Sequence, residues 1–161
     1  YYCVFFSRGS PVLQRAILFA KDYGFKKYYG SYEELVSDPG LQIVYIASPH
    51  SHHYEHTMLC LKNGKHVICE KAFAMNSKEV KGMISEAKKR KLFLMEALWP
   101  PFQPFYKKAH EIIQSGILGK IFYLDGYFSF IPPYEPDDRK FNLYLGGCSL
   151  LDIVIYQVIW H

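Results

Sequence analysis

Short apolar runs alternate with segments of helical periodicity over the first 98 residues of the chain. The runs are rich in β-branched and aromatic residues, and turn residues such as Gly9, Pro49 and Gly64 separate the elements. Parallel neighbours in a sheet require long crossover connections, so this alternation predicts an α/β fold with a doubly wound parallel sheet. The predicted strands cover residues 2–7, 42–47, 67–69 and 92–95.

Capping residues mark the predicted helices between these strands. Ser31 is followed three residues later by Glu34, and Asn76 is followed by Glu79, which is the spacing of an N-terminal cap. Gly64 lies where the cap that ends a helix over 52–63 is expected. A first helix begins at about residue 12, and the helix after Asn76 has an apolar stripe that predicts its buried face: Val80, Met83, Ile84 and Ala87.

The pattern changes near Leu98, where we place a domain boundary that divides the chain into residues 1–98 and 99–161. A helix is predicted over 104–115, and partial alternation of aromatic residues over 120–130 predicts a strand of an antiparallel sheet. A loop over 131–145 leads to a final helix, on which Asp152 and Tyr156 share a face four residues apart.

Composition narrows the class of protein. The net charge of +4 is mild and the lysines are scattered, so nucleic acid and membrane surfaces are not expected partners. The four cysteines form no Cys-x-x-Cys pair, which is typical of reduced thiols inside a cell. No run reaches the roughly 18 apolar residues of a membrane span, and the first residues of the sequence lack the charged-then-apolar order of a signal peptide. The sequence therefore predicts a soluble, cytoplasmic protein.

The strand over 67–69 ends abruptly in Glu70 and Lys71. The carboxyl ends of parallel strands are where open α/β sheets bind ligands, so Lys71 is the first candidate for chemistry. A strand that simply ends in solvated charges is the alternative that spacing alone leaves open.

Four histidines gather just after the strand over 42–47, and two of them, His52 and His56, have the spacing of one helix face. This spacing permits a metal site, but neither cysteine nor carboxylate nearby completes a ligand set, so no metal is expected. The other two are His50 and His53.

Four motifs occur in the order typical of one enzyme family and extend over essentially the whole chain. They are Ser48-Pro49 with His53, the run 64–71 that ends in Glu70-Lys71, the run 94–99 that ends in Trp99, and Gly146-Gly147 with Asp152 and Tyr156. The chain thereby resembles the glucose-fructose oxidoreductase/inositol dehydrogenase (Gfo/Idh/MocA) family. Within that family it is most similar to the branch of dimeric dihydrodiol dehydrogenases and NADP-dependent D-xylose dehydrogenases.

The resemblance implies an N-terminal Rossmann domain followed by an α/β domain with an open sheet that often mediates dimerisation. Residues 1–98 would be a partial NADP-binding domain without its first strand and Gly-x-Gly-x-x-Gly turn, and residues 99–161 would begin the substrate and dimerisation domain. A homodimer is expected if that second domain is complete. Because those glycines let backbone N–H groups approach the pyrophosphate, the chain alone is expected to be a weak or inactive enzyme.

The cofactor that the resemblance implies is NADP. Ser7 and Arg8 follow the strand over 2–7, and a hydroxyl with a guanidinium suits the 2′-phosphate of NADP, whereas NAD would favour an acid there. A turn that merely contains these two residues is the alternative. Ser48, Pro49 and His53 match the family's cofactor-flanking loop.

The reaction that the resemblance implies is hydride transfer from a secondary alcohol, of a trans-dihydrodiol or of D-xylose, to the nicotinamide. Glu70 and Lys71 match the Glu-Lys of the family's Glu-Lys-Pro motif, whose lysine lies beside the nicotinamide ribose and the substrate hydroxyl. Tyr156 matches the acid/base position, and a neighbouring ammonium favours its phenolate. Asp152 would orient Tyr156 or a substrate hydroxyl, and Trp99 matches an aromatic residue of the substrate site.

Three departures from the family pattern keep a second hypothesis open. Ala72 replaces the proline that stiffens the turn after Lys71, Val154 stands where glycine is usual, and Pro100-Pro101 replaces a usual Thr-Arg. Together with the absent glycine turn, they favour the alternative of a non-catalytic relative, such as a pseudoenzyme or a module that pairs with an intact subunit.

Overall fold

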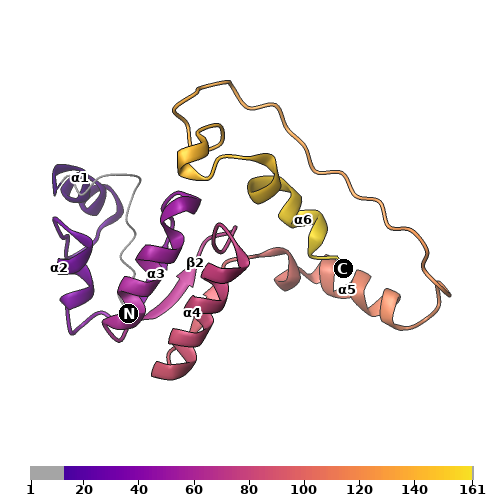
Figure 1. The fold of residues 1–161 in the computed structure, drawn as a ribbon, viewed down its shortest axis with the longest axis horizontal. Helices are drawn as coiled ribbons and strands as arrows, with labels where there is room; N and C mark the ends of the chain where they lie inside the picture. Colours follow the sequence, from indigo (N-terminus) through magenta and orange to yellow (C-terminus); the bar gives the residue numbers. More distant parts are fainter. Residues whose placement is uncertain (1–12, 161) are drawn as a thin grey trace.

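The computed structural model describes residues 13–160, and Figure 1 shows their arrangement. The strand predicted over 2–7, and with it Ser7 and Arg8, lies outside the described residues.

A three-stranded parallel sheet organises the first part of the chain. Its strands β1 (Ile43–Ile46), β2 (His66–Cys69) and β3 (Leu94–Glu96) lie in the order β1-β2-β3. The register places Cys69 between Ile46 and Glu96, so the three carboxyl ends meet at one edge. The crossovers carry α3 (His53–Lys62) and α4 (Ser77–Arg90). The predicted doubly wound, Rossmann-type parallel sheet is therefore confirmed.

The predicted caps fix the ends of the helices. Ser31 accepts a hydrogen bond from the Glu34 N–H (3.1 Å) at the start of α2 (Tyr32–Ser37), and Asn76 accepts one from the Glu79 N–H (3.0 Å) at the start of α4. Gly64 has φ = +74°, a value that favours glycine, just after α3 ends. Helix α1 (Leu13–Tyr23) precedes them, and a 3₁₀ turn, η1 (His50–His52), joins β1 to α3.

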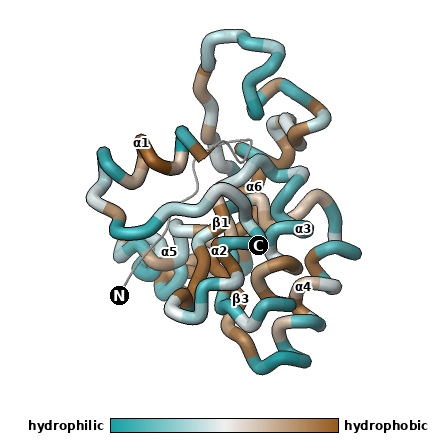
Figure 2. Tube along the Cα trace, turned by 90° about the vertical axis from the view of Figure 1, so that its left-hand side faces the viewer, coloured by the Kyte–Doolittle hydropathy of each residue, from teal (hydrophilic) through white to brown (hydrophobic). Residues whose placement is uncertain are grey.

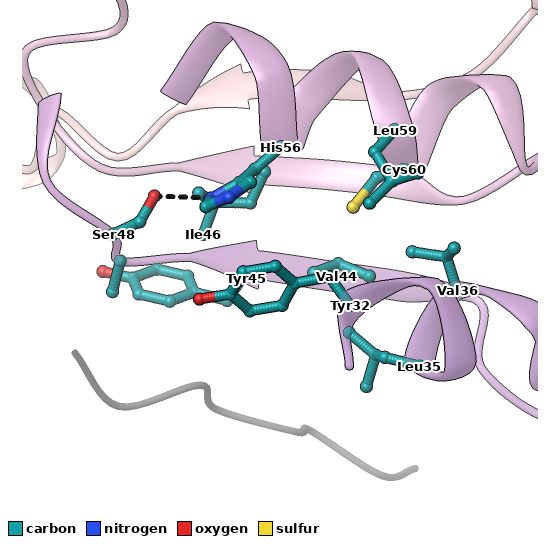
Figure 3. A pocket seen from close by; sticks show the side chains of 11 residues that line it. Tyr32, Leu35, Val36, Val44, Tyr45, Ile46, Ser48, His56, Leu59 and Cys60 are labelled. Carbon is teal, nitrogen blue, oxygen red and sulfur yellow. Dashed lines mark hydrogen bonds between the residues drawn. The ribbon is translucent and has the colours of Figure 1, made fainter. Parts of the chain in front are cut away.

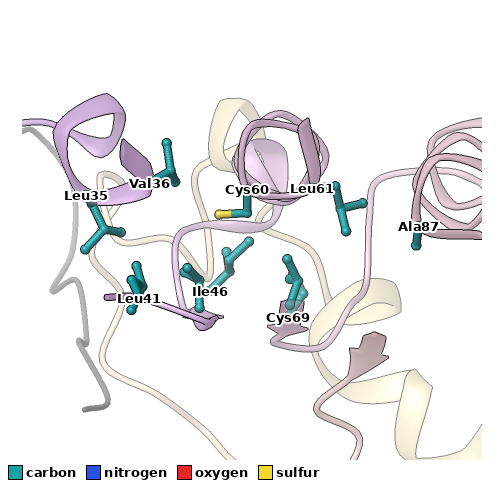
Figure 4. Packing of buried hydrophobic residues seen from close by; sticks show 10 residues of the cluster. Leu35, Val36, Leu41, Ile46, Cys60, Leu61, Cys69 and Ala87 are labelled. Carbon is teal, nitrogen blue, oxygen red and sulfur yellow. The ribbon is translucent and has the colours of Figure 1, made fainter. Parts of the chain in front are cut away.

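The hydrophobic core lies between the sheet and helices α2, α3 and α4. In Figure 4, Leu61 of α3 and Ala87 of α4 lie on the sides of their helices that face the strands. In Figure 2, β1 and β3 lie among hydrophobic positions. Met83 and Ala87 are buried on α4 as predicted, but Ile84 is 38% exposed. Ile84 follows Met83 directly, so its side chain points to the edge of the buried face and not into the core. The buried cluster consists of Leu35, Val36, Leu41, Val44, Ile46, Cys60, Leu61, Val67, Cys69 and Ala87.

The buried thiols behave as core residues. Cys60 and Cys69 are free, and burial raises the pKa of each to about 12. Between residues 13 and 160, no helix has both the length and the apolar character needed to cross a membrane.

The second part of the chain contains helices but no strand over 120–130. A 3₁₀ turn, η2 (Pro100–Phe102), leads into α5 (Pro104–Gln114), after which residues 120–134 form the long extended trace drawn in orange in Figure 1. The predicted antiparallel strand is wrong for the described structure. No strand among residues 13–160 lies alongside this segment, so ladder hydrogen bonds do not form despite its β-type sequence.

The final helix differs from the predicted one in its first turn. After η3 (Leu143–Leu145), a π-helical turn, η4 (Leu150–Val154), continues into α6 (Ile155–Val158). Asp152 and Tyr156 therefore lie on either side of the change from π to α geometry.

Candidate active site

The Lys71 side chain joins the end of β2 to η4, which is 81 residues away in the sequence. Its ammonium donates to Asp152 Oδ1 (2.6 Å) and to the Asp152 carbonyl oxygen (2.7 Å). The side chains of Lys71 and Asp152 are only 14% and 10% exposed. The first predicted candidate for chemistry is thus held in a nearly buried ion pair and is not a solvated charge.

Asp152 is ionised because two cations approach it. Burial alone would raise the pKa of its carboxyl, but the hydrogen bond and charge of Lys71, with Arg139 adding to them, hold that pKa below its ordinary value. Arg139 Nη1 lies 3.5 Å from the same oxygen that accepts from Lys71. The described part of the site therefore carries two positive charges around one negative charge.

Tyr156 lies against this pair, as the sequence predicts. The Lys71 ammonium is 5.2 Å from the centroid of the Tyr156 ring, and Trp99 Nε1 is 3.4 Å from the Tyr156 hydroxyl. The Phe128 ring lies 4.8 Å from that of Tyr156. A cation, a phenol and two further aromatic rings therefore converge in one place.

The turn that carries Lys71 is fixed by side chains from three other segments. The Phe73 N–H donates to Glu96 Oε1 (2.9 Å) at the end of β3, and the Lys71 N–H donates to Glu70 Oε2 (3.2 Å). The carbonyl oxygens of Lys71 and Ala72 face the rings of His50 and His53. The Lys71–Ala72 peptide bond is cis. Contacts from β3, η1 and α3 therefore hold the turn in place.

Glu70 and Glu96 end neighbouring strands. The Tyr45 hydroxyl donates to Glu70 Oε1. Glu70 also accepts from the Lys71 N–H, so it connects β1 to the Lys71 turn. Burial raises the pKa of Glu96; the hydrogen bond from the Phe73 N–H partly opposes that shift, and the charge of Glu70 adds to it.

His53 supports the predicted cofactor loop from inside the protein. Its ring is fully buried, with Nδ1 2.7 Å from the Ala72 carbonyl oxygen and Nε2 2.8 Å from that of Ser48. Burial lowers its pKa, and the two carbonyl oxygens partly oppose that shift. Ser48 and Pro49 lie at the carboxyl end of β1 as predicted, but no part of the His53 ring is exposed to a cofactor in this arrangement.

One further histidine of the cluster, His56, lines an apolar pocket beside β1, seen in Figure 3. His56 Nδ1 lies 3.0 Å from Ser48 Oγ, and its ring lies 5.5 Å from that of His52. Across residues 13–160, no three His, Cys, Asp or Glu side chains are placed to hold a metal ion. The lining residues come from α2, β1 and α3 and do not include Lys71, Asp152 or Tyr156.

Two residues of the site are not predicted as site residues from the sequence. The first is His50, which the sequence places only in the histidine cluster. Its position directly after β1, at the sheet edge where ligands bind, is a signal that could have identified it. The second is Arg139, which lies in a loop without hydrophobic periodicity. No local sequence pattern predicts its contact with Asp152, because that contact depends on tertiary packing.

The fold and this geometry are compatible with one class of protein. A parallel sheet with a lysine at its carboxyl edge, packed against an aspartate of η4 and a tyrosine of α6, fits a dinucleotide-dependent oxidoreductase. The family model described as "Oxidoreductase family, NAD-binding Rossmann fold" (GFO_IDH_MocA) matches residues 5–98. The chain belongs to this family, so the resemblance of its motifs is confirmed.

Two curated relatives agree with that assignment. D-xylose 1-dehydrogenase (NADP(+)) of Hypocrea jecorina is 41% identical over an alignment of 142 residues that covers 83% of this chain and 36% of the relative. Human trans-1,2-dihydrobenzene-1,2-diol dehydrogenase is 40% identical over 146 residues, which are 91% of this chain and 43% of the relative. The chain thus spans less than half the length of these relatives.

A solved structure supports the fold alone. The crystal structure of an NAD-binding protein from Listeria innocua matches 88% of this chain and 41% of its own chain, with a TM-score of 0.72 and 24% identity.

Proposed function

We propose that the protein is an NADP-dependent oxidoreductase that oxidises a secondary alcohol of a trans-dihydrodiol or D-xylose type by hydride transfer to the nicotinamide. The observation that carries this proposal is the convergence of Lys71, Asp152 and Tyr156 at the carboxyl edge of a parallel sheet. The dehydrogenase names of the two curated relatives support the reaction class.

Each residue has a distinct role in this proposal. Tyr156, reacting as its phenolate, accepts the hydroxyl proton of the alcohol and becomes a neutral phenol, and the Lys71 ammonium stabilises the negative charge that develops on the alcohol oxygen. Asp152 does not react. Its two acceptor oxygens, the carboxylate and the carbonyl, hold the Lys71 ammonium in place.

The residues present fit the nicotinamide end of the cofactor. The sheet edge supplies Lys71 as a cation and Ser48 with Pro49 as a loop flank, all at the carboxyl ends of parallel strands. When bound, NADP supplies the hydride acceptor. The preference for NADP over NAD rests on the residue types of Ser7 and Arg8 and on the printed name of the xylose relative.

The substrate would lie against the aromatic side chains. Trp99 is 52% exposed and Phe128 is 46% exposed, so each offers a face to a diol ring or a sugar.

The domain boundary near Leu98, the homodimer and the cytoplasmic location also stay predictions.

A fluorescence titration tests the cofactor part of the proposal. The purified protein should bind NADPH in the micromolar to millimolar range typical of enzyme ligands and bind NADH more weakly. Arg8→Asp should reverse that preference, whereas Lys26→Asp, the same change of charge sign at an exposed lysine, should leave it unchanged. Failure to bind either nucleotide would favour the non-catalytic pairing module.

A further inference from the structure

We propose that His50 is a positioning residue that joins the Lys71 turn, residues 70–75, to the segment leading into Asp152 and Tyr156. The effect of His50 on catalysis rests on the proposed function. The contact that His50 makes between the two segments can be tested by a structural measurement that requires no enzyme activity.

The His50 ring lies between two carbonyl oxygens that belong to distant parts of the chain. Its Nε2 is 3.2 Å from the Lys71 carbonyl oxygen, and its Nδ1 is 3.1 Å from the Gly146 carbonyl oxygen. Only 4% of the residue is exposed. Both neighbours can only accept, so a neutral ring donates to one of them and an imidazolium donates to both. The ring therefore bridges the catalytic lysine and Gly146 directly.

The backbone at Gly146 is shaped to receive this ring. Gly146 has φ = +80°, and a Cβ at this position would come within 2.8 Å of His50 Cβ and within 2.8 Å of Met75 Sδ. Any other residue would separate the segment from the ring and from the Lys71 turn. At Gly146 the segment therefore packs against both His50 and the Lys71 turn with no room for a side chain.

The contact determines where the reacting groups lie. Gly146 precedes Asp152 by only six residues, and the Asp152 N–H is held by the Cys148 carbonyl oxygen (3.1 Å) within η4. On the other side, His50 holds the carbonyl of Lys71 itself. A shift of His50 would therefore change the distance from the Lys71 ammonium to Tyr156.

A space-filling role for the ring is the competing explanation, and two substitutions separate it from a hydrogen-bonding role. His50→Phe keeps a ring of similar volume but removes both nitrogen atoms. His50→Gln loses the ring but restores an N–H₂ group that can donate to two carbonyl oxygens. His52→Gln, in the same turn but contacting neither segment, is the matched control.

Amide hydrogen exchange measures the link directly. The N–H groups of Phe73 and Gly147 are each hydrogen-bonded, one on either side of the bridge, and the Val67 N–H in β2 is an internal reference. In His50→Phe, exchange at Phe73 and Gly147 should accelerate at least about tenfold while Val67 is unchanged, and His50→Gln should restore most of the protection. If His50→Phe fails to fold, the comparison of His50→Gln with the parent decides, since a space-filling role predicts accelerated exchange there.

Kinetics then test the catalytic meaning. His50→Phe should lower kcat by roughly 10- to 100-fold with KM and NADPH affinity nearly unchanged, because misplacement of reacting groups affects the chemical step. Parent-like exchange in His50→Phe would overturn the link. Accelerated exchange with unchanged kcat would overturn the positioning role. Failure of the parent to bind NADPH would count against the proposed function, and the exchange result would still decide the link.

Discussion

Removing the charge of Asp152 should destabilise the protein far more than removing a surface charge. Asp152→Asn keeps the size of the side chain but leaves the nearly buried Lys71 ammonium facing a neutral amide. Loss of one partner of a buried ion pair costs about 3–5 kcal/mol, and Lys71 retains the Asp152 carbonyl oxygen as an acceptor, so we expect about 2–3 kcal/mol.

A double-mutant cycle measures this interaction by urea unfolding. Asp152→Asn, Lys71→Met and the double variant should give a coupling energy of about 2 kcal/mol at neutral pH. The matched control is the pair Lys108–Glu111, whose side chains are 72% and 65% exposed and should couple by less than about 0.5 kcal/mol. Equal coupling in the two cycles would refute the buried pair.

The pH dependence gives a second check on the same pair. The folded-state pKa of Asp152 lies below its ordinary value of 3.8, so its stabilisation is complete above that value and is lost as the pH falls through the folded-state pKa. Asp152→Asn should remove this acid-range loss of stability. An unchanged slope in the variant would contradict the assignment.

Three further predictions follow from the packing around the site. Gly147→Ala should cost about 1–3 kcal/mol in urea unfolding, since its Cβ would lie 2.7 Å from the Arg139 carbonyl oxygen, whereas Gly126→Ala, with its nearest neighbour at 3.8 Å, should stay within about 0.5 kcal/mol. Arg139→Met should cost less than about 1 kcal/mol at neutral pH but move the acid loss of stability to higher pH, because one cation beside Asp152 is gone; an unmoved acid midpoint would contradict this. The parent should lose stability as the pH falls below 6.5, because burial lowers the pKa of His53 in the folded state and the unfolded chain therefore binds the proton first. His53→Gln should flatten this part of the profile of unfolding free energy against pH, and an equally steep profile in the variant would count against the prediction.

The sequence predicted the parallel sheet because its strands and crossovers leave local marks. The caps at Ser31 and Asn76 and the glycine at residue 64 were found from single residues whose backbone roles are specific. The strand over 120–130 was wrong because β propensity describes a segment that can pair, and pairing depends on a neighbour elsewhere in the chain.

The sequence predicts only part of the site, because some of its residues are brought together by tertiary contacts that leave no local pattern. Lys71 could be singled out from the end of its strand, and Asp152 and Tyr156 from the resemblance to a family. The position of His50 directly after β1 marks it as a candidate, but its bridge to Gly146 could not be predicted, and Arg139 could not be assigned at all. Both contacts depend on the close packing of Gly146 and Gly147. Such contacts have no period and no fixed spacing.

The most direct test of the account is the appearance of reduced nicotinamide when the protein is mixed with NADP⁺ and a trans-dihydrodiol or D-xylose. Turnover is expected to be weak, so the protein is used at high concentration and saturating cofactor. Any product formed by the parent should also be formed by the control Lys108→Met, and none should be formed by Lys71→Met or Tyr156→Phe. Equal product formation by the parent and by Lys71→Met would contradict the catalytic assignment of Lys71.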